Sequence, residues 1–390
     1  MSVSFDDTKI TFESKSTREL QVLKLIFSVL NRPFYVFLGT SIIKWALQFR
    51  LPIKGLIKAT LFNQFCGGEN IQGCENKINQ LKKFNVKTIL DYSVEGQENE
   101  QSFDQTLKET LKAIQFATQH DAIPFCVLKL TGLGSKSLMT KIQLGKELSL
   151  DEQNQFNRFR DRGFEVAVEI LKLNQRLLID AEESWYQDVI DTFIYELMIK
   201  CNTERALVYN TYQFYRHNML DRMKAGFENI IASKAYFGAK MVRGAYMEQE
   251  RIRSQSLGYL DPIQSNKDNT DRDFNAGVKF IMDNLNSCSI CLGTHNEASS
   301  RDLVILIQKY GYEKNDPRIF FAQLLGMSDN ISFKLSDEGY NVAKYMPYGP
   351  LEQIMPYLFR RAKENTSVQG QSSRELLLIK KELERRKLKL

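Results

Sequence analysis

Short apolar runs alternate with longer amphipathic stretches between residues 86 and 365. Apolar runs bounded by turn residues are typical of buried strands, and the stretches between them are long enough for helices. This regular alternation predicts parallel strands that are joined by helices. The strand-like runs cover residues 88–96, 125–133, 176–184, 205–213, 239–246, 289–296, 319–327 and 341–349.

Eight such runs predict an α/β fold, a (β/α)8 TIM-like barrel over residues 86–365, and the length suits that fold. Residues 1–85 are expected to form an N-terminal helical arm, and residues 366–390 a basic, amphipathic C-terminal tail. One connection, residues 134–175, is long and is predicted to be helical. Within it, Ser149 and Glu152 have the spacing of a capping box.

Polar side chains end at least six of the predicted strands, and in a barrel the chemistry gathers at the carboxyl ends of the strands. A single Lys or Asp at a strand end is more typical of a solvated terminus, and His295 alone would suit a hydrogen-bonded core histidine. Convergence on one rim favours a functional site instead. The residues are Lys129, Asp180, Glu182, Asn210, Gln213, Arg243, Thr294, His295, Asn296 and Gln323.

Composition adds that the chain folds around a sizeable core, since 43% of its 390 residues are hydrophobic. The opening residues 1–14 lack the basic start and apolar run of a signal peptide and the Arg-rich character of a transit peptide. We therefore expect a cytoplasmic protein, with peripheral contact at the inner face of the membrane left open.

The six scattered cysteines favour free thiols in a reducing compartment. Cys288 and Cys291 have C-x-x-C spacing, but no second pair accompanies them, so no metal site is expected.

The net charge of +6 is concentrated at the two ends of the chain. No acidic residue occurs between residues 21 and 68, where six basic residues interrupt apolar stretches such as "FYVFLGTSIIKWALQF". That run is too short and too charged to span a bilayer. It suits either an arm packed on its own protein or a peripheral membrane surface. No aromatic-interleaved basic motif is present, so a nucleic-acid partner is not expected. The six basic residues are Lys24, Arg32, Lys44, Arg50, Lys54 and Lys58.

Several reaction classes lack their motifs. The chain has three histidines and no H-E-x-x-H, and it contains no G-x-S-x-G elbow. The segment "TGLGSKS" lacks the third glycine of a Rossmann turn and the G-K-[ST] of a P-loop, and it is interpreted as a loop. Any dinucleotide must therefore be held by the barrel itself.

Four segments in order resemble the proline dehydrogenase family in its mitochondrial-type branch: "LIDAEES" (178–184), "KMVRGAYMEQER" (240–251), "GTHNE" (293–297) and "YMPYGPLEQIMPYLFRRAKEN" (345–365). The resemblance implies a barrel that binds FAD without a Rossmann domain. It also implies oxidation of L-proline to Δ1-pyrroline-5-carboxylate, with electrons passed to a quinone. A 4-hydroxyproline dehydrogenase and a non-catalytic, membrane-associated scaffold remain as alternatives.

The resemblance also assigns substrate residues. Arg360 and Arg361 match an arginine pair that binds the substrate carboxylate, and two planar donors can hold it by bidentate hydrogen bonds. Pro356 predicts a kink or a late start of their helix. Tyr345 matches a tyrosine of proline-specific members, where hydroxyproline enzymes tend to carry serine. The other matches are Lys129 as a further cation, Tyr357 packed on the substrate ring, and Asp180 and Lys240 as the catalytic pair.

For the cofactor, the resemblance implies contacts around the whole rim. Bacterial single-domain members usually carry Arg and Gln where this chain has Lys240 and Asn210, so a guanidinium role at position 240 is replaced by an ammonium. The implied cofactor-binding residues are Ala181, Asn210, Gln213, Lys240, Val242, Arg243, Gly244, Ala245, Ser265, Lys267, Thr294, His295, Asn296, Gln323 and Glu364.

Overall fold

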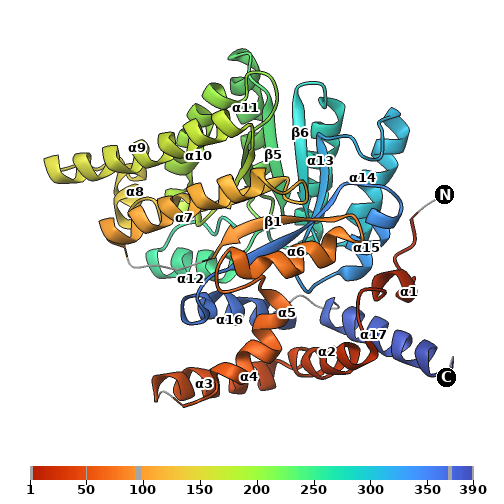
Figure 1. Ribbon diagram of the computed structural model, residues 1–390. Helices are drawn as coiled ribbons and strands as arrows, with labels where there is room; N and C mark the ends of the chain where they lie inside the picture. Colours follow the sequence, from red (N-terminus) through yellow and green to blue (C-terminus); the bar gives the residue numbers. More distant parts are fainter. Residues whose placement is uncertain (1–2, 50, 94–97, 368–370, 389–390) are drawn as a thin grey trace. The chain divides into compact units, whose positions relative to one another are not determined.

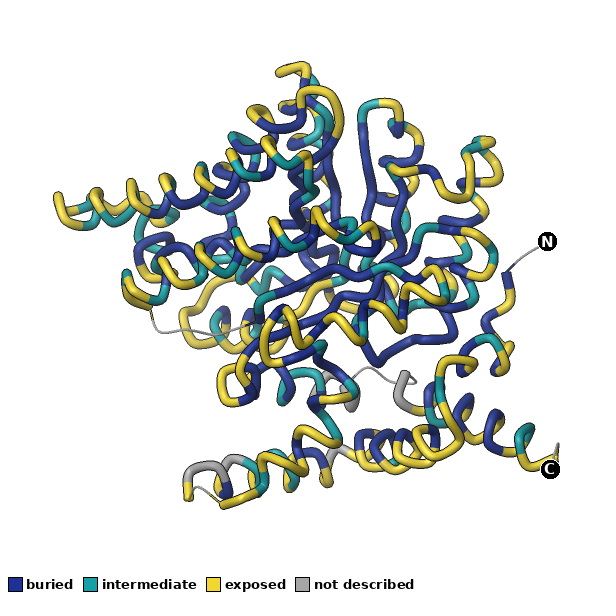
Figure 2. Tube along the Cα trace, in the orientation of Figure 1, coloured by how far each residue is buried: buried dark blue, intermediate teal, exposed yellow. Residues whose placement is uncertain are grey.

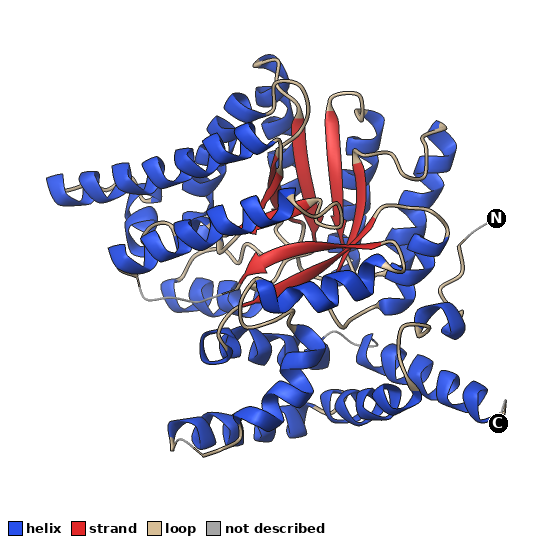
Figure 3. Ribbon diagram, in the orientation of Figure 1, coloured by secondary structure: helices blue, strands red, loops and turns tan. Residues whose placement is uncertain are grey.

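The computed structural model describes residues 3–49, 51–93, 98–367 and 371–388. Its eight parallel strands close into a barrel in which each strand neighbours the next along the chain (strands are red in Figure 3). The predicted (β/α)8 barrel is therefore confirmed. The strands are β1 (Val86–Tyr92), β2 (Phe125–Leu128), β3 (Arg176–Ile179), β4 (Val208–Gln213), β5 (Phe237–Val242), β6 (Cys288–Gly293), β7 (Ile319–Leu324) and β8 (Val342–Tyr348).

Most strands end earlier than the apolar runs predicted. β3 ends at Ile179 although the run was expected to reach residue 184, and β2 ends at Leu128, one residue before a 3-10 turn over Leu130–Gly132. The end of the first predicted strand, residues 94–96, lies outside the described residues. The Asp180 amide still donates to the Leu128 carbonyl of β2, but the Glu182 amide donates to the Gln187 side chain of α10 and the Glu182 carbonyl accepts from the Gln213 side chain of β4. Several candidate site residues therefore lie in loops just beyond the strands.

The chain divides into two compact units, of which the first, here called the barrel unit, is Gly96–Ala322. The long connection in it is helical as predicted, and the expected capping box is present: the Ser149 hydroxyl accepts from the Glu152 amide, and Glu152 accepts from the Ser149 amide. The helices, labelled in Figure 1, are α7 (Glu100–Thr118), α8 (Lys136–Gln143), α9 (Leu150–Leu173), α10 (Ser184–Cys201), α11 (Met219–Ala232), α12 (Met247–Leu257), α13 (Lys267–Asp283) and α14 (Glu297–Tyr310).

The strands of the barrel unit are buried along almost their whole length, as the dark blue traces of β5 and β6 show in Figure 2. The ring of Phe125 meets those of Tyr209 and Phe320 edge to face, with centroids 5.3 Å and 4.9 Å apart. The Arg176 guanidinium lies 5.5 Å and 5.4 Å from the Phe125 and Phe320 ring centres. These side chains, from β2, β3, β4 and β7, form a packed interior rather than a pore.

The second unit, here called the arm unit, joins Met1–Glu95 to Gln323–Leu390. α2 buries Leu20, Leu23 and Phe27 and packs beside α17, which buries Leu378 and Ile379 (Figure 1). The predicted helical arm and C-terminal helix are thus both present. The helices are α1 (Thr8–Thr11), α2 (Thr17–Leu30), α3 (Pro33–Gln48), α4 (Lys54–Ile57), α5 (Asn63–Phe65), α6 (Glu75–Lys82), α15 (Asp329–Asp337), α16 (Leu351–Ser367) and α17 (Gln371–Lys387). A π-helical turn covers Lys58–Phe62, and a 3-10 turn covers Gln72–Cys74.

No helix among the described residues is by itself long and apolar enough to cross a bilayer. Taken together, Thr17–Leu30 and Phe34–Ile43 have the length and composition of a membrane-spanning segment, but the chain bends by 103° between them.

A buried charge cluster holds the arm unit together. The Lys344 ammonium of β8 lies 2.8 Å from the Asp329 carboxylate of α15 and donates to the Met327 carbonyl. Lys15 approaches the same carboxylate at 3.3 Å. Glu375 of α17 accepts from the Ser328 amide, and its burial, with Asp329 nearby, raises its pKa to about 7. The cluster therefore connects both chain ends of the unit to β8.

Candidate active site

Asp180 lies in the loop directly after β3, between Lys129, which follows β2, and Lys240 of β5. Its Oδ1 accepts from Lys240 Nζ at 2.6 Å, and its Oδ2 lies 3.3 Å from Lys129 Nζ. The loop is fixed at this point because the Asp180 amide donates to the Leu128 carbonyl at 2.9 Å. The Lys240 side chain is 9% exposed and that of Lys129 is 32% exposed. The structure thus brings together Lys129 and Asp180, which the sequence placed at two strand ends, and Lys240, which the family resemblance paired with Asp180.

Gly244 and Ala245 follow β5 in a tight turn. Gly244 has φ +130°, and a Cβ on it would lie 2.2 Å from the Tyr215 ring, so no other residue fits there without strain. The Ala245 amide donates to Gln213 Oε1 at 3.2 Å. Gln213 in turn donates from Nε2 to the Glu182 carbonyl at 2.7 Å. The carboxyl ends of β3, β4 and β5 are therefore tied to one another through one amide side chain.

Arg243 connects the β5 end with β6 and α13. Its guanidinium pairs with Asp271 at 2.7 Å and donates to the hydroxyls of Thr294 and Ser299 at 2.8 and 2.9 Å. It also lies 4.4 Å from the centre of the Phe274 ring. Through these contacts Arg243 ties the end of β5 to α13, to Thr294 after β6 and to Ser299 of α14.

The residues after β6 and those before α13 stabilise the N-termini of α14 and α13. Asn296 caps α14 by accepting from the Ser299 amide at 3.0 Å, and its own amide donates to the Thr294 hydroxyl at 3.1 Å. Partly buried His295 lies between these two residues. At the start of α13, Ser265 accepts from the Asn269 side chain at 3.0 Å, and Lys267 pairs with Asp271. Lys267 and Arg243 therefore share one carboxylate.

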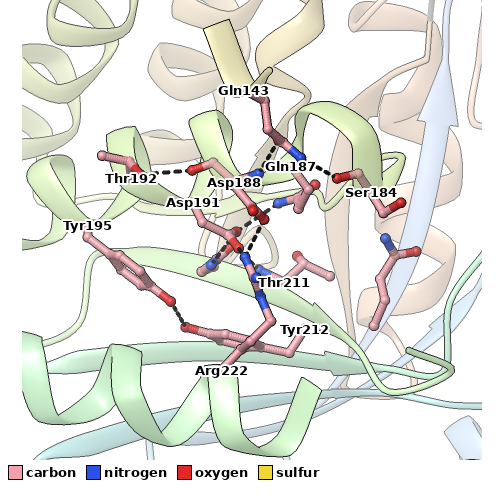
Figure 4. A network of polar contacts seen from close by, with 12 residues as sticks. Gln143, Ser184, Gln187, Asp188, Asp191, Thr192, Tyr195, Thr211, Tyr212 and Arg222 are labelled. Carbon is pink, nitrogen blue, oxygen red and sulfur yellow. Dashed lines mark hydrogen bonds and ion pairs between the residues drawn. The ribbon is translucent and has the colours of Figure 1, made fainter. Parts of the chain in front are cut away.

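The Asn210 side chain turns toward α10 rather than along the rim. Its Nδ2 donates to the buried carboxylate of Asp191 at 3.0 Å, and its Oδ1 accepts from the Thr211 amide at 2.8 Å. Asp191 also accepts from Gln187 at 2.8 Å and faces Arg222 of α11 at 3.3 Å (Figure 4). Burial raises the pKa of Asp191. The expected flavin contact of Asn210 stays a prediction, since this network occupies its amide.

The sequence did not single out the network behind the strands. Gln187 and Asp191 stand four residues apart on one face of α10, and Arg222 reaches them from α11. The only sequence signal for this network was the i, i+4 spacing of Gln187 and Asp191, and such spacing is common on helices. Glu182 had been noted at the end of a strand without a role, although the structure gives it four hydrogen bonds.

The remaining expected substrate residues lie in the arm unit. Tyr345 is buried in β8, and its carbonyl accepts from the Leu325 amide at 2.9 Å. Tyr357 is buried in α16, where the Arg361 guanidinium lies 5.3 Å from the centre of its ring. Gln323 is buried at the end of β7 and accepts from the Ser332 hydroxyl at 2.8 Å. These residues are ordered by the arm unit's own packing.

α16 itself departs from expectation. The helix begins at Leu351, and Pro356 is its sixth residue, so of the two predicted alternatives the late start is wrong and the kink stays a prediction. Pro356 lies beyond the first four residues, whose amides have no intrahelical partner, so its missing N–H costs one intrahelical hydrogen bond. Arg360 follows it in a half-buried position. Glu364 belongs to the same helix, but its side chain lies outside the described residues.

Within the described residues, no group of three or more His, Cys, Asp or Glu side chains is arranged to hold a metal ion. All six cysteines are buried free thiols. Cys288 and Cys291 lie in β6, and burial raises the pKa of each to about 12, so neither is a reactive thiolate at neutral pH. The chemistry of this site thus rests on carboxylates, cations, hydroxyls and amides.

The chain is similar to known proteins over most of its length. The family model for proline dehydrogenase matches residues 74–374. The mitochondrial proline dehydrogenase 1 of Dictyostelium discoideum is 32% identical over 426 aligned residues, which cover 97% of this chain and 74% of that protein. A hydroxyproline dehydrogenase of Xenopus laevis is 27% identical over 99% of this chain and 90% of its own length.

Among solved structures, proline utilization A from Bdellovibrio bacteriovorus superposes with a TM-score of 0.72 at 19% identity, over 81% of this chain. The chain spans about a third (34%) of that larger protein. At this identity the likeness shows the barrel fold alone. The match of the family model over most of the sequence, together with the Dictyostelium relative, shows more: the chain belongs to the proline dehydrogenase family.

Proposed function

We propose that this chain oxidises L-proline to Δ1-pyrroline-5-carboxylate with FAD as its cofactor and a quinone as electron acceptor. The observation that carries the proposal is the Asp180 carboxylate after β3, which is held between Lys129, after β2, and Lys240 of β5. A barrel of the proline dehydrogenase family with this charge arrangement suits a small zwitterionic amino acid. Its relative in Dictyostelium is named a proline dehydrogenase.

The residues present fit a flavin dinucleotide. Exposed Gly244 and Ala245 leave the backbone after β5 open to close approach, because no side chain larger than a methyl group covers it. Lys240 would stand beside the ring system and Lys267 beside the adenosine half. When bound, the flavin accepts the hydride that leaves the substrate. The further residues that would hold it are Ala181, Gln213, Val242, Arg243, Ser265, Thr294, His295, Asn296, Gln323 and Glu364, with Asn210 supporting from behind.

The substrate would be held by charge and shape. Arg360 and Arg361 would bind the carboxylate by charge-assisted hydrogen bonds, and Tyr345 and Tyr357 would pack on the apolar ring. Asp180 would accept a hydrogen bond from the substrate amine, which has to lose its proton before the carbon beside it can give up hydride and a C=N bond can form. Lys240 would keep positive charge where negative charge develops.

Steady-state oxidation of L-proline with a soluble quinone tests this proposal, with trans-4-hydroxy-L-proline as the competing substrate. We expect a yellow purified protein with turnover on proline at least tenfold faster than on hydroxyproline. Faster turnover on hydroxyproline would favour the activity named for the Xenopus relative. A colourless chain that does not take up FAD would favour the non-catalytic scaffold.

We also propose that the arm unit contacts a lipid surface, where a membrane quinone would be reached. α3 exposes large apolar side chains, with Phe34 69%, Phe37 70% and Trp45 56% exposed. Such a patch suits an interfacial helix. The basic contribution is smaller than the sequence indicated, because Lys54 pairs with Glu352 and Lys58 with Glu69. The Lys44 side chain and Arg50 lie outside the described residues.

Vesicle sedimentation tests the lipid contact. A triple Phe34→Ser, Phe37→Ser, Trp45→Ser variant should lose most of its binding to vesicles of mixed anionic and zwitterionic lipid, since each large side chain contributes about 1.5–3 kcal/mol when buried. A matched control replaces three equally exposed residues of the barrel unit: Leu150, Ile252 and Leu260. Equal binding by both triple variants, or none by the parent, would refute the contact. The Dictyostelium relative is named as mitochondrial, and the compartment of this chain stays a prediction.

A further inference from the structure

Glu182, two residues beyond Asp180, is bonded through every polar group it has. Its carboxylate accepts from the Thr131 amide at 3.1 Å and from the Thr131 hydroxyl. Its amide donates to Gln187 Oε1 at 2.6 Å, and its carbonyl accepts from Gln213 Nε2 at 2.7 Å. The residue is 2% exposed. It therefore joins the loop after β2, α10 and the end of β4 at a single point.

These bonds extend on both sides to residues with proposed roles. Gln213 continues to the Ala245 amide in the turn after β5. Gln187 continues to Asp191, which faces Arg222 of α11 (Figure 4). The chain of bonds thus runs from the helix layer behind the strands to the turn where the backbone is open. Asp180 lies in the same short loop as the residue at the centre of the chain.

We propose that Glu182 is a positioning residue for the reaction, which holds the loop after β3 so that Asp180 stays between Lys129 and Lys240. The inference rests on the proposed function. The ionised carboxylate accepts from the Thr131 amide and hydroxyl together, and such charge-assisted bonds are about twice as strong as neutral ones. A neutral acid or an amide at this position still accepts from the Thr131 amide, but the Thr131 hydroxyl then has to turn and accept in a weaker, neutral bond. Loss of charge at Glu182 therefore loosens the link between the loops after β2 and β3.

The Glu182 carboxyl group ionises within the physiological pH range. Burial raises the pKa of its carboxyl to about 7. The charged and titratable groups that act on it are Lys129 from the loop after β2, Glu183 from its own loop and Tyr186 from α10. Lys129 favours the carboxylate and Glu183 opposes it. Above pH 7 the carboxylate accepts both bonds, and below pH 7 the neutral acid holds Thr131 by weaker bonds that lack charge assistance. Activity that depends on the loop position thus falls as the pH is lowered through this range.

The test compares three variants of the flavin-loaded enzyme with the parent. Thr131→Val removes one donor without changing the shape, and we expect it to lower kcat/KM for L-proline by about tenfold. Thr131→Ser keeps the hydroxyl and should stay within about twofold of the parent. Glu182→Gln should lower kcat/KM by about tenfold at pH 8.5 and by little at pH 6. Proline itself titrates in the same way with both enzymes, so dividing kcat/KM of the parent by that of the variant removes this contribution to the pH dependence.

The outcomes separate this inference from the function it rests on. A parent that does not oxidise proline refutes the proposed function. An active parent overturns the positioning role if Thr131→Val matches Thr131→Ser, or if the ratio of parent to Glu182→Gln does not change with pH. If Glu182→Gln does not fold, the threonine pair still decides. Flavin absorbance of each variant controls for cofactor loss, which a purely structural role would produce.

Discussion

The two lysines that flank Asp180 should differ in their contribution to stability. Lys240 Nζ lies 2.6 Å from the carboxylate and its side chain is 9% exposed, whereas Lys129 Nζ lies 3.3 Å away and is 32% exposed. At an effective dielectric constant of about 20, charges 2.6 Å apart attract by about 6 kcal/mol, and at the dielectric constant of water charges 3.3 Å apart attract by about 1 kcal/mol. The cost of desolvating Lys240 and Asp180 offsets much of the attraction between them. We expect net coupling energies of about 2–3 kcal/mol for Lys240 and about 0.2–1 kcal/mol for Lys129.

Double-mutant cycles with urea unfolding measure these couplings. One cycle combines Lys240→Met with Asp180→Asn, and the other combines Lys129→Met with Asp180→Asn, all at equal flavin saturation. Lys240→Met alone should be the most destabilising lysine change, because it leaves the carboxylate with its more distant partner. Equal coupling energies in the two cycles, or a larger one for Lys129, would refute the reasoning from distance and burial.

Three further predictions follow from other residues. Arg361→Met should raise KM for proline about ten- to a hundredfold while flavin content stays unchanged, since one charge-assisted hydrogen bond is lost; an unchanged KM would exclude a carboxylate clamp. Tyr345→Ser should narrow the preference for proline over hydroxyproline, mostly through lost proline turnover, and kcat/KM for both substrates decides this. The pKa of Glu375 is raised to about 7, so its ionisation costs stability as the pH rises from about 4.5 through 7. Glu375→Gln should therefore raise Tm more at pH 8 than at pH 5, and an equal effect at both values would contradict the assignment.

The barrel was predictable because its signal is repeated. Eight apolar runs at regular spacing define parallel strands, and parallel strands that alternate with helices have few possible topologies. The ends of the strands were less predictable. Glu182 continues a strand-like sequence pattern, yet its amide donates to the Gln187 side chain of α10 and its carbonyl accepts from the Gln213 side chain of β4. Which partner takes such a group depends on tertiary contacts that a single sequence does not display.

The rim residues were found in sequence through their position, and their neighbours behind the strands were missed. Asp180 lies near the end of an apolar run, so its polarity is conspicuous, whereas Lys240 was assigned only through the family resemblance. Asp191 and Arg222 lie on helices, where charged residues usually face water. They come together because α10 and α11 pack side by side over β4, although the two residues are some thirty positions apart in the sequence. Periodicity alone cannot distinguish such a pair from a solvated one.

The central claim is that this chain removes hydride from L-proline at the Asp180 rim. Its most direct measurement is anaerobic mixing of the flavin-loaded protein with L-proline, with flavin absorbance followed in a stopped-flow instrument. The account predicts that the flavin is bleached at a rate that saturates with proline concentration, with one equivalent of Δ1-pyrroline-5-carboxylate per flavin. It also predicts slower bleaching in Asp180→Asn. A bound flavin that stays oxidised in the presence of saturating proline would contradict the account.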